Sequence, residues 1–414
     1  MPTQPALPQN YILDEGTLLE GFENAADWTI QEAQNGGTWL NDPTVFKFGN
    51  QSIRCTAING YVSVNKPITP RVMNPRMIGI WVYLHTAANT ISNIDIRLSS
   101  IPTVDKFIRA QINYTVGGVF PASRITEGWN FLTFHRDEFV YINGESWANP
   151  MVWLKIVVYS ATGQTAIVSI DSLYFDFECL PARCLLTFDD ARNTTIDDRC
   201  LKYMNDRGIK GTVYVIRDTV GVGDTMTVDQ LDTLYDAGWA LGNHTSGHNH
   251  MASLSLADAT ARLRECTEWL VQHGYERAAR HLAYPFGEYN DTAQAAMASA
   301  GMLTGRTTNY SLQSTPPGNL YTLQIWDAGT ASHTLAQAKT VIDIAVRYQK
   351  TVIFMFHHLV VSNPGTEEWT FADFQALIDY IVARKIKCVT IDEWYNGLTN
   401  PRYRSLPPSR LNIA

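Results

Sequence analysis

The sequence is poor in charged residues, and it has neither a basic block nor a long apolar run. Only 17% of its 414 residues are charged, and 32 Lys and Arg stand against 40 Asp and Glu, for a formal net charge of −8. The acidic excess and the missing Lys/Arg cluster argue against a nucleic-acid partner. Because no apolar run reaches the ~18 residues that cross a bilayer, we expect no membrane insertion.

The first residues also lack a basic segment followed by an apolar one, so we expect no secretory signal peptide. Export by another route, to an extracellular or virion-associated location, stays open, as does an oligomer. Six cysteines without a Cys-x-x-Cys pair are too few for a disulfide scaffold. We expect buried free thiols, although Cys179 and Cys184 are close enough in sequence to form a bridge.

Hydrophobic residues make up 45% of the sequence, which argues against disorder. The two halves of the chain differ in the periodicity of these residues. The first half has short β-branched and aromatic segments separated by Asn, Gly, Pro and Ser clusters. This pattern indicates an all-β antiparallel sandwich over residues 1–180. The predicted strands are 51–56, 61–64, 78–84, 94–98, 129–135, 152–159 and 166–175.

From residue 181 to about 400, predicted strands and helices alternate, and we expect a short tail over 401–414. Alternation predicts a parallel sheet, and about seven repeats predict a closed or nearly closed barrel. The predicted strands are 184–188, 212–216, 239–242, 281–284, 303–306, 351–356 and 388–391. The predicted helices are 195–207, 227–238, one that begins at a Ser255/Asp258 capping pair, 291–300, 335–348 and 371–384.

Chemically active residues follow four of these strands, at the barrel end where active sites lie. Asp189 and Asp190 alone are typical of a helix cap beside a solvated carboxylate. His244 and His248 alone are typical of two surface histidines, but in one helical turn both rings would face one metal ion. With one carboxylate, they would form a two-His, one-Asp set with an open position, as in catalytic zinc sites. His250 has no assigned role.

Four motifs resemble those of the polysaccharide deacetylases of carbohydrate esterase family 4. They are LTFDD at 186–190, HTSGH at 244–248, YPFG at 284–287 and the strand end at His357. The resemblance covers about half of the chain, and the first two motifs are the more specific ones. It implies a distorted (β/α)7-type barrel, in agreement with the number of predicted strands, a divalent metal, most simply Zn²⁺, and an acetylated polysaccharide as substrate.

The resemblance also implies roles for single residues. Asp189 would be the general base, and the metal ligands would be Asp190, His244 and His248. His357 would be the general acid, in preference to His358, because the strand pleat aims adjacent side chains in opposite directions. The backbone N–H of Phe286 would stabilise the oxyanion.

Two positions depart from the family pattern. The arginine that usually stands two residues before the motif proline is replaced by Ala283, and Arg306 on the next strand is the candidate substitute. The aspartate that tunes the acid histidine has no clear match, and Asp327 beside Trp326 is the nearest candidate.

The first half loosely resembles jelly-roll carbohydrate-binding modules. GFEN at 21–24 with Trp28, GNQSIR at 49–54, GWNFLTF at 128–134 and SIDSLYF at 169–175 are the segments that carry this resemblance. Aromatic side chains could stack on sugar rings there, although each is individually typical of a core residue. The four candidates are Trp39, Trp81, Trp147 and Trp153.

The sequence is therefore compatible with three hypotheses about the function. The leading hypothesis is a metal-dependent hydrolase that removes N- or O-linked acetyl groups from a polysaccharide. The alternatives are a non-catalytic glycan-binding protein, such as a phage tail-associated adhesin, and a metal-dependent amidase acting on small amides.

Overall fold

The computed structural model describes residues 17–73, 77–102, 105–112, 125–175, 181–315, 317–329 and 333–399. They form two compact units, one built mainly from residues before 176 and the other mainly from residues after 180. The predicted junction at 180, Cys179 and the predicted tail at 401–414 lie outside the described residues. Within these ranges, every helix is too short or too polar to cross a membrane.

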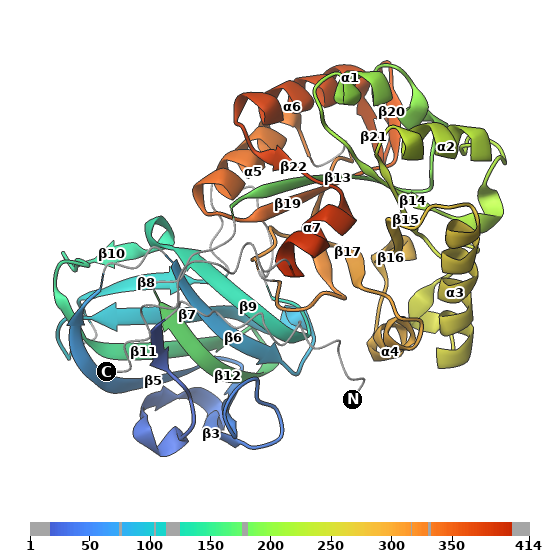
Figure 1. Cartoon of the computed structure of the whole chain (residues 1–414). Coiled ribbons are helices and arrows are strands. Elements are labelled where there is room, and N and C mark those ends of the chain that lie inside the picture. Colours follow the sequence, from blue (N-terminus) through green and yellow to red (C-terminus); the bar gives the residue numbers. More distant parts are fainter. Residues whose placement is uncertain are drawn as a thin grey trace. The chain divides into compact units, whose positions relative to one another are not determined.

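The first unit is an antiparallel sandwich of two six-stranded sheets (Figure 1). One sheet has the order β3-β4-β12-β6-β9, with β1 also paired to β12, and the other has the order β10-β8-β7-β11-β5-β2. The two sheets share one apolar core, which confirms the predicted sandwich. The strands are β1 (Thr17–Glu20), β2 (Thr29–Ala33), β3 (Thr38–Asp42), β4 (Ser52–Ile58), β5 (Tyr61–Val72), β6 (Met77–Leu84), β7 (Ile91–Ser99), β8 (Phe107–Gln111), β9 (Gly128–His135), β10 (Val140–Ile142), β11 (Pro150–Ser160) and β12 (Thr165–Phe175).

The second unit is a closed barrel of seven parallel strands, as the alternation predicted. The ring runs β14-β15-β16-β17-β18-β19-β13 and closes by pairing of β13 with β14, with helices outside it (Figure 1). The strands are β13 (Arg183–Phe188), β14 (Thr212–Val215), β15 (Ala240–Asn243), β16 (Ala278–Ala283), β17 (Thr304–Tyr310), β18 (Leu323–Asp327) and β19 (Thr351–Phe356). The helices are α1 (Leu201–Asn205), α2 (Val228–Asp236), α3 (Leu256–Gln272), α4 (Asp291–Ser299), α5 (Leu335–Arg347), α6 (Phe371–Ala383) and α7 (Ile391–Thr399).

Side-chain caps fix where the longer helices begin. Asp258 N–H donates to the Ser255 hydroxyl at 3.1 Å at the start of α3. Thr227 and Gln230 form a reciprocal capping box at α2. Since each cap satisfies backbone N–H groups that the first turn leaves free, α2 and α3 begin where the capping residues predict.

One predicted barrel strand is wrong, and one real strand was missed. Residues 388–391 form only the two-residue strand β22 (Lys387–Cys388), which pairs with β13 outside the ring. The chain then turns into α7 because the Glu393 carboxylate accepts a hydrogen bond from Thr390 N–H at 3.1 Å, as in a capping box. The missing place in the ring is taken by β18, which was not predicted although four of its five residues are buried.

The predicted helix at 195–207 is also largely wrong, since only α1 forms within it, after a 3₁₀ turn at Asn193–Ile196. Asp197 breaks the continuous helix because its carboxylate accepts a hydrogen bond from Arg199 N–H at 2.8 Å. Such a local bond competes with the helical pattern. A further short parallel pair, β20 (His358–Val360) and β21 (Glu368–Thr370), follows the last barrel strand.

Candidate active site

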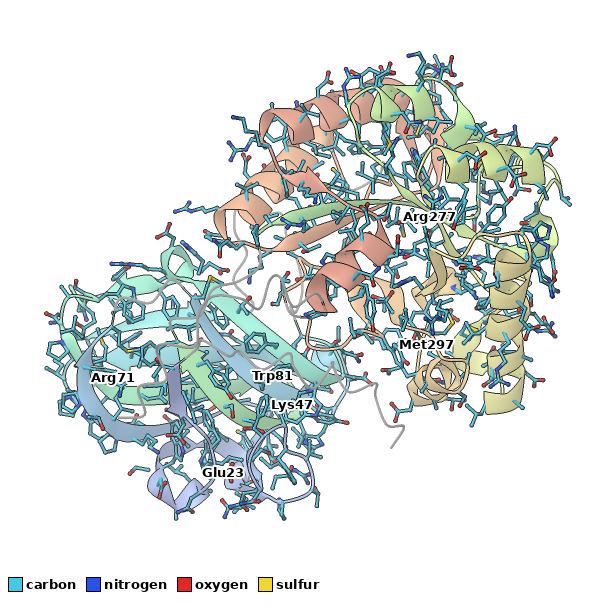
Figure 2. The ribbon with its side chains drawn as sticks, viewed as in Figure 1. Glu23, Lys47, Arg71, Trp81, Arg277 and Met297 are labelled. Carbon is cyan, nitrogen blue, oxygen red and sulfur yellow. The ribbon has the colours of Figure 1, made fainter. Side chains whose placement is uncertain are left out.

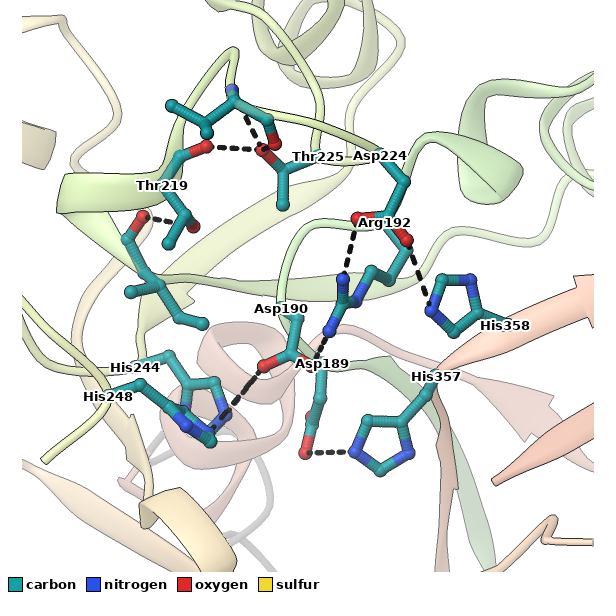
Figure 3. Close-up of polar contacts among 12 residues, drawn as sticks. Asp189, Asp190, Arg192, Thr219, Asp224, Thr225, His244, His248, His357 and His358 are labelled. Atoms are coloured by element: carbon teal, nitrogen blue, oxygen red, sulfur yellow. Dashed lines mark hydrogen bonds and ion pairs between the residues drawn. The ribbon is translucent and has the colours of Figure 1, made fainter. Parts of the chain in front are cut away.

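The chemically active residues converge at one end of the barrel. Asp189 and Asp190 follow β13, His244 follows β15, and His357 follows β19. Backbone hydrogen bonds fix the ends of these strands, for example from Asp189 N–H to the Phe356 carbonyl at 2.9 Å. Parallel strands place their carboxyl ends on the same rim, so residues distant in sequence meet there (Figure 3).

Asp190, His244 and His248 form a cluster with the geometry of a metal site. One donor atom from each lies within 4.8 Å of the others. The Nε2 atoms of the two histidines lie 3.4 Å and 3.7 Å from Asp190 Oδ1 (Figure 3). Asp190 Oδ1 is buried without a hydrogen-bond partner among the described residues, so its lone pairs are free for a cation. Burying an unpaired carboxylate oxygen is costly, which makes a bound cation the natural complement.

The tautomer of His244 also suits a metal ligand. Its Nδ1 lies 2.8 Å from the Ala283 carbonyl oxygen, which can only accept, so Nδ1 carries the proton. The Nε2 lone pair therefore faces Asp190. A carbonyl that orients the far nitrogen of a histidine is a common support of metal ligands.

The electrostatics keep the cluster in the ligating protonation states. Burial raises the pKa of Asp190, but the neighbouring His244 ring and the charges of His357 and Arg192 outweigh it and hold this pKa well below its usual range. Burial, together with the charge of His244, lowers the pKa of His248 to about 4. At neutral pH the cluster therefore offers a carboxylate and a neutral His248 imidazole.

Left-handed backbone, rather than a helical turn, aims these side chains. Residues 245–247 form a turn, and Thr245 and His248 have φ values of 65° and 54°. Asp190 (φ 63°) and Ala191 (φ 52°) bend the chain sharply after β13, so the adjacent carboxylates of 189 and 190 diverge. Such conformations cost non-glycine residues about 1–3 kcal/mol each and gather where function requires them. The two rings therefore meet without the helical turn that the spacing of four residues would have required.

Arg192 was not singled out from the sequence, yet it fixes the metal-site carboxylate. Its Nη2 donates to Asp190 Oδ2 at 2.9 Å, and its Nη1 donates to Asp224 Oδ1 at 2.7 Å (Figure 3). The guanidinium thus occupies one oxygen of Asp190 and leaves the other facing the histidines. Its position two residues after Asp190 does not by itself predict this contact.

Asp189 is buried and pairs with Arg306. The Arg306 Nη2 group donates to Asp189 Oδ2, and both side chains are nearly inaccessible, at 1% and 4% exposure. Asp189 Oδ1 is buried with no hydrogen-bond partner among the described residues. The structure therefore places the arginine of β17 where the resemblance lacked one at Ala283.

His357 and His358 point in different directions. His357 Nε2 lies 3.9 Å from Asp189 Oδ2, whereas His358 Nε2 lies 3.3 Å from Asp224 Oδ2 (Figure 3). His357 is therefore the one beside Asp189. Asp327 is engaged elsewhere, since it accepts hydrogen bonds from the Tyr310 hydroxyl at 3.2 Å and from Gly329 N–H at 2.8 Å.

Phe286 presents both its backbone and its ring to the site. It lies in the 3₁₀ turn Pro285–Gly287 with φ 57°. Its ring stacks on His250 at 4.0 Å between centroids and tilts against His248 at 4.5 Å. His250 in turn lies 2.9 Å from the Glu288 carboxylate, away from the metal cluster. The ring contact of Phe286 was not predicted.

Three of the four tryptophans proposed for sugar stacking are buried. Trp39, Trp81 and Trp147 are 4%, 2% and 2% exposed. Figure 2 shows Lys47 beside Trp81, and its ammonium lies 4.6 Å from the ring centroid. Only Trp153 remains half-buried on an outer face, so the other three cannot stack on sugars in this structure.

The polysaccharide deacetylase family matches residues 181–305, which contain Asp189, Asp190, His244, His248 and Phe286. The protein YxkH of Bacillus subtilis (strain 168), named for the same family, is 24% identical over 124 residues. That match covers 30% of this chain, and the chain spans 44% of the length of that relative.

Among solved structures, the chitin deacetylase of Colletotrichum lindemuthianum is 16% identical, with a TM-score of 0.38, over 57% of this chain and 96% of that one. The Bacillus anthracis protein BA3943, a pseudoenzyme of carbohydrate esterase family 4, is 16% identical, with a TM-score of 0.37, over 53% and 66%. These likenesses are too weak to indicate a substrate. The similarity to polysaccharide deacetylases therefore rests on the family match at 181–305.

Proposed function

We propose that the barrel unit is a metal-dependent hydrolase that removes acetyl groups from a polysaccharide. The observation that carries this proposal is the convergence of Asp190, His244 and His248 beside the partly unpaired carboxylate of Asp189. A structural metal site would not need a buried free carboxylate next to it. The family match at 181–305 supports the choice of an acetylated polysaccharide as substrate.

The donor set of one carboxylate and two neutral imidazoles fits a divalent ion, and Zn²⁺ suits it best. When bound there, such an ion would polarise the acetyl carbonyl and make a water molecule more acidic. Asp190, His244 and His248 would hold it. Arg192 would keep Asp190 oriented by retaining its second oxygen.

The other groups have separate tasks in the hydrolysis. Asp189 accepts the proton of the attacking water on Oδ1, while Arg306 holds its Oδ2. The N–H of Phe286 donates to the acetyl oxygen as negative charge develops there, a contribution of about 3–4 kcal/mol in comparable sites. His357, protonated on the nitrogen that faces Asp189, donates a proton to the leaving amine or alcohol.

The test is acetate release from acetylated polysaccharides before and after treatment with a chelator. Activity that is lost with the metal and restored by Zn²⁺ supports the proposal, and Asp189→Asn should abolish it while metal binding persists. A protein that binds zinc and glycan but releases no acetate would instead be a glycan-binding protein with an inactive barrel.

A further inference from the structure

The outer face of one sheet of the first unit carries a polar and aromatic cleft. In β11, Leu154, Ile156 and Val158 point into the shared core, so the alternate residues lie on the opposite face of the sheet. Over that face lies a cleft of about 570 Å³. Its lining residues are Gln31, Glu32, Tyr61, Ser63, Arg97, Lys155, Val157 and Tyr159. The volume is typical of small-molecule sites, which span about 300–1,000 Å³.

Two tyrosine rings form the aromatic part of the cleft. Tyr61 on β5 and Tyr159 on β11 are directly paired across the sheet, with ring centroids 5.3 Å apart. Trp153, two residues beyond Lys155 on the same side of β11, lines a smaller adjoining hollow with Phe107. Flat aromatic faces beside polar groups suit ligands that are apolar on one side and hydroxylated at the rim.

The polar side chains of the cleft are already oriented. The Arg97 guanidinium donates to Asp95 through Nε at 3.1 Å and to the Tyr159 hydroxyl through Nη2 at 3.0 Å. Lys155 Nζ donates to Gln31 Oε1 at 2.7 Å. Because these groups are fixed before binding, a ligand loses little free energy in ordering them.

One buried hydroxyl in the cleft still lacks a partner. Ser63 is 3% exposed, and its Oγ has no hydrogen-bond partner among the described residues. It lies between Glu32 and Val157 in the sheet register, at the floor of the cleft. A buried hydroxyl without a partner is uncommon, and a hydroxylated ligand would supply one.

The charges around the cleft nearly cancel. Arg97, Lys155 and Arg109, which is paired with Arg97 in the sheet, lie beside Glu32 and Asp95. A polyanion would meet two carboxylates and a polycation three basic groups, so neither is complementary to this face. A peptide added as a β-strand needs a sheet edge, whereas β11 and β7 are paired on both sides.

We propose that this cleft binds a neutral oligosaccharide, with a sugar ring against Tyr61 and Tyr159 and its hydroxyls bonded to Gln31, Ser63, Arg97 and Lys155. The choice of a polysaccharide as the natural ligand rests on the proposed function of the barrel. The cleft itself is defined by the first unit alone.

Calorimetric titration of the full chain with neutral oligosaccharides tests the proposal. The probes are chitin-, xylan-, cellulose- and mannan-derived hexamers, used with the Asp189→Asn variant so that no acetyl group is removed during the titration. Tyr159→Ala should weaken binding about tenfold through the lost stacking surface. Lys155→Met should weaken it as well. Tyr141→Ala, a change to an exposed tyrosine of the same unit, should leave it unchanged.

Binding to at least one probe that weakens with both cleft variants, but not with the control, supports the proposal. No binding to any probe, or binding that the cleft variants leave intact, overturns it. Affinity that falls steeply with salt would also contradict it, because a neutral ligand displaces few counterions. A separate assay measures acetate release from a small acetyl substrate by the single variant Tyr159→Ala, in which Asp189 is unchanged. It distinguishes failure of the proposed sugar binding in the cleft from failure of the proposed hydrolysis in the barrel.

Discussion

The buried pair of Asp189 and Arg306 makes the sharpest prediction. Arg306→Met removes a guanidinium that is 1% exposed and leaves the Asp189 carboxylate, 4% exposed, without its positive partner. Breaking a buried ion pair from one side costs about 3–5 kcal/mol, because a charge stays buried without compensation. For a unit of this size, that corresponds to a fall in melting temperature of roughly 6–20 °C.

The measurement is scanning calorimetry with excess chelator, so that metal binding does not contribute to stability. The matched control is Arg199→Met, which breaks the exposed pair with Asp197 in the same unit and should cost far less stability. In the double variant Asp189→Asn/Arg306→Met no charge is left stranded, so its loss should be smaller than the sum of the two single losses.

The reasoning fails if Arg306→Met costs no more than Arg199→Met. It also fails if the losses of the two single changes simply add in the double variant. Either result would mean that the Asp189 carboxylate is stable in the barrel without the guanidinium, and that Arg306 does not hold it.

The remaining predictions concern the metal site and one buried histidine. His244→Gln should abolish Zn²⁺ binding in equilibrium dialysis, whereas His250→Gln should retain it, because His250 contacts Glu288 instead; equal losses would contradict the assigned ligand set. Arg192→Gln should weaken Zn²⁺ binding about 10–100-fold by releasing Asp190, with unfolding stability nearly unchanged; unaltered affinity would remove Arg192 from the site. Burial lowers the pKa of His281 to about 3 from 6.5, so the unfolded chain takes up the proton first and stability falls as the pH drops below about 6.5. Between pH 7 and 5 this group should cost ~2 kcal/mol, and urea unfolding of His281→Asn should show a shallower loss; parallel curves for the two proteins would refute the assignment.

The sequence predicted the barrel because strand and helix periods alternate, but it did so with one wrong strand. Residues 388–391 are apolar and β-branched, and only the contact between Thr390 and Glu393 reveals that a helix begins there. Strand β18 was missed because it is short and follows a long irregular segment. The two errors cancel in number, so the predicted count of seven agrees with the closed ring.

Part of the candidate site could also be predicted from the sequence, because the periodicity shows where the strands end. The position of residues after strands brought Asp190, His244 and His248 together, since parallel strands end on one rim. Contacts between strands that are not neighbours in the ring, such as that of Arg306 on β17 with Asp189 after β13, could only be offered as a hypothesis. The role of Arg192 was invisible, because it depends on a guanidinium reaching back two residues.

The tryptophans show that amino-acid composition does not distinguish core aromatic residues from sugar-binding ones. Aromatic residues in an all-β unit fit a core and a sugar platform equally well, and three of the four proposed are in fact buried. Sequence alternation identifies the two faces of a strand, but it does not say which outer face stays open. The tyrosines of β5 and β11 lie on an open face and had not been singled out.

Five residues around the barrel rim have left-handed main-chain conformations, namely Asp190, Ala191, Thr245, His248 and Phe286. The direction in which each side chain leaves the rim is therefore set by peptide geometry, and not by the chemical group that happens to be attached. Exchanging donor types at 190, 244 and 248 should change the preferred ion while leaving the attachment points almost where they are. This rim is consequently a suitable framework for building coordination chemistries other than the natural one.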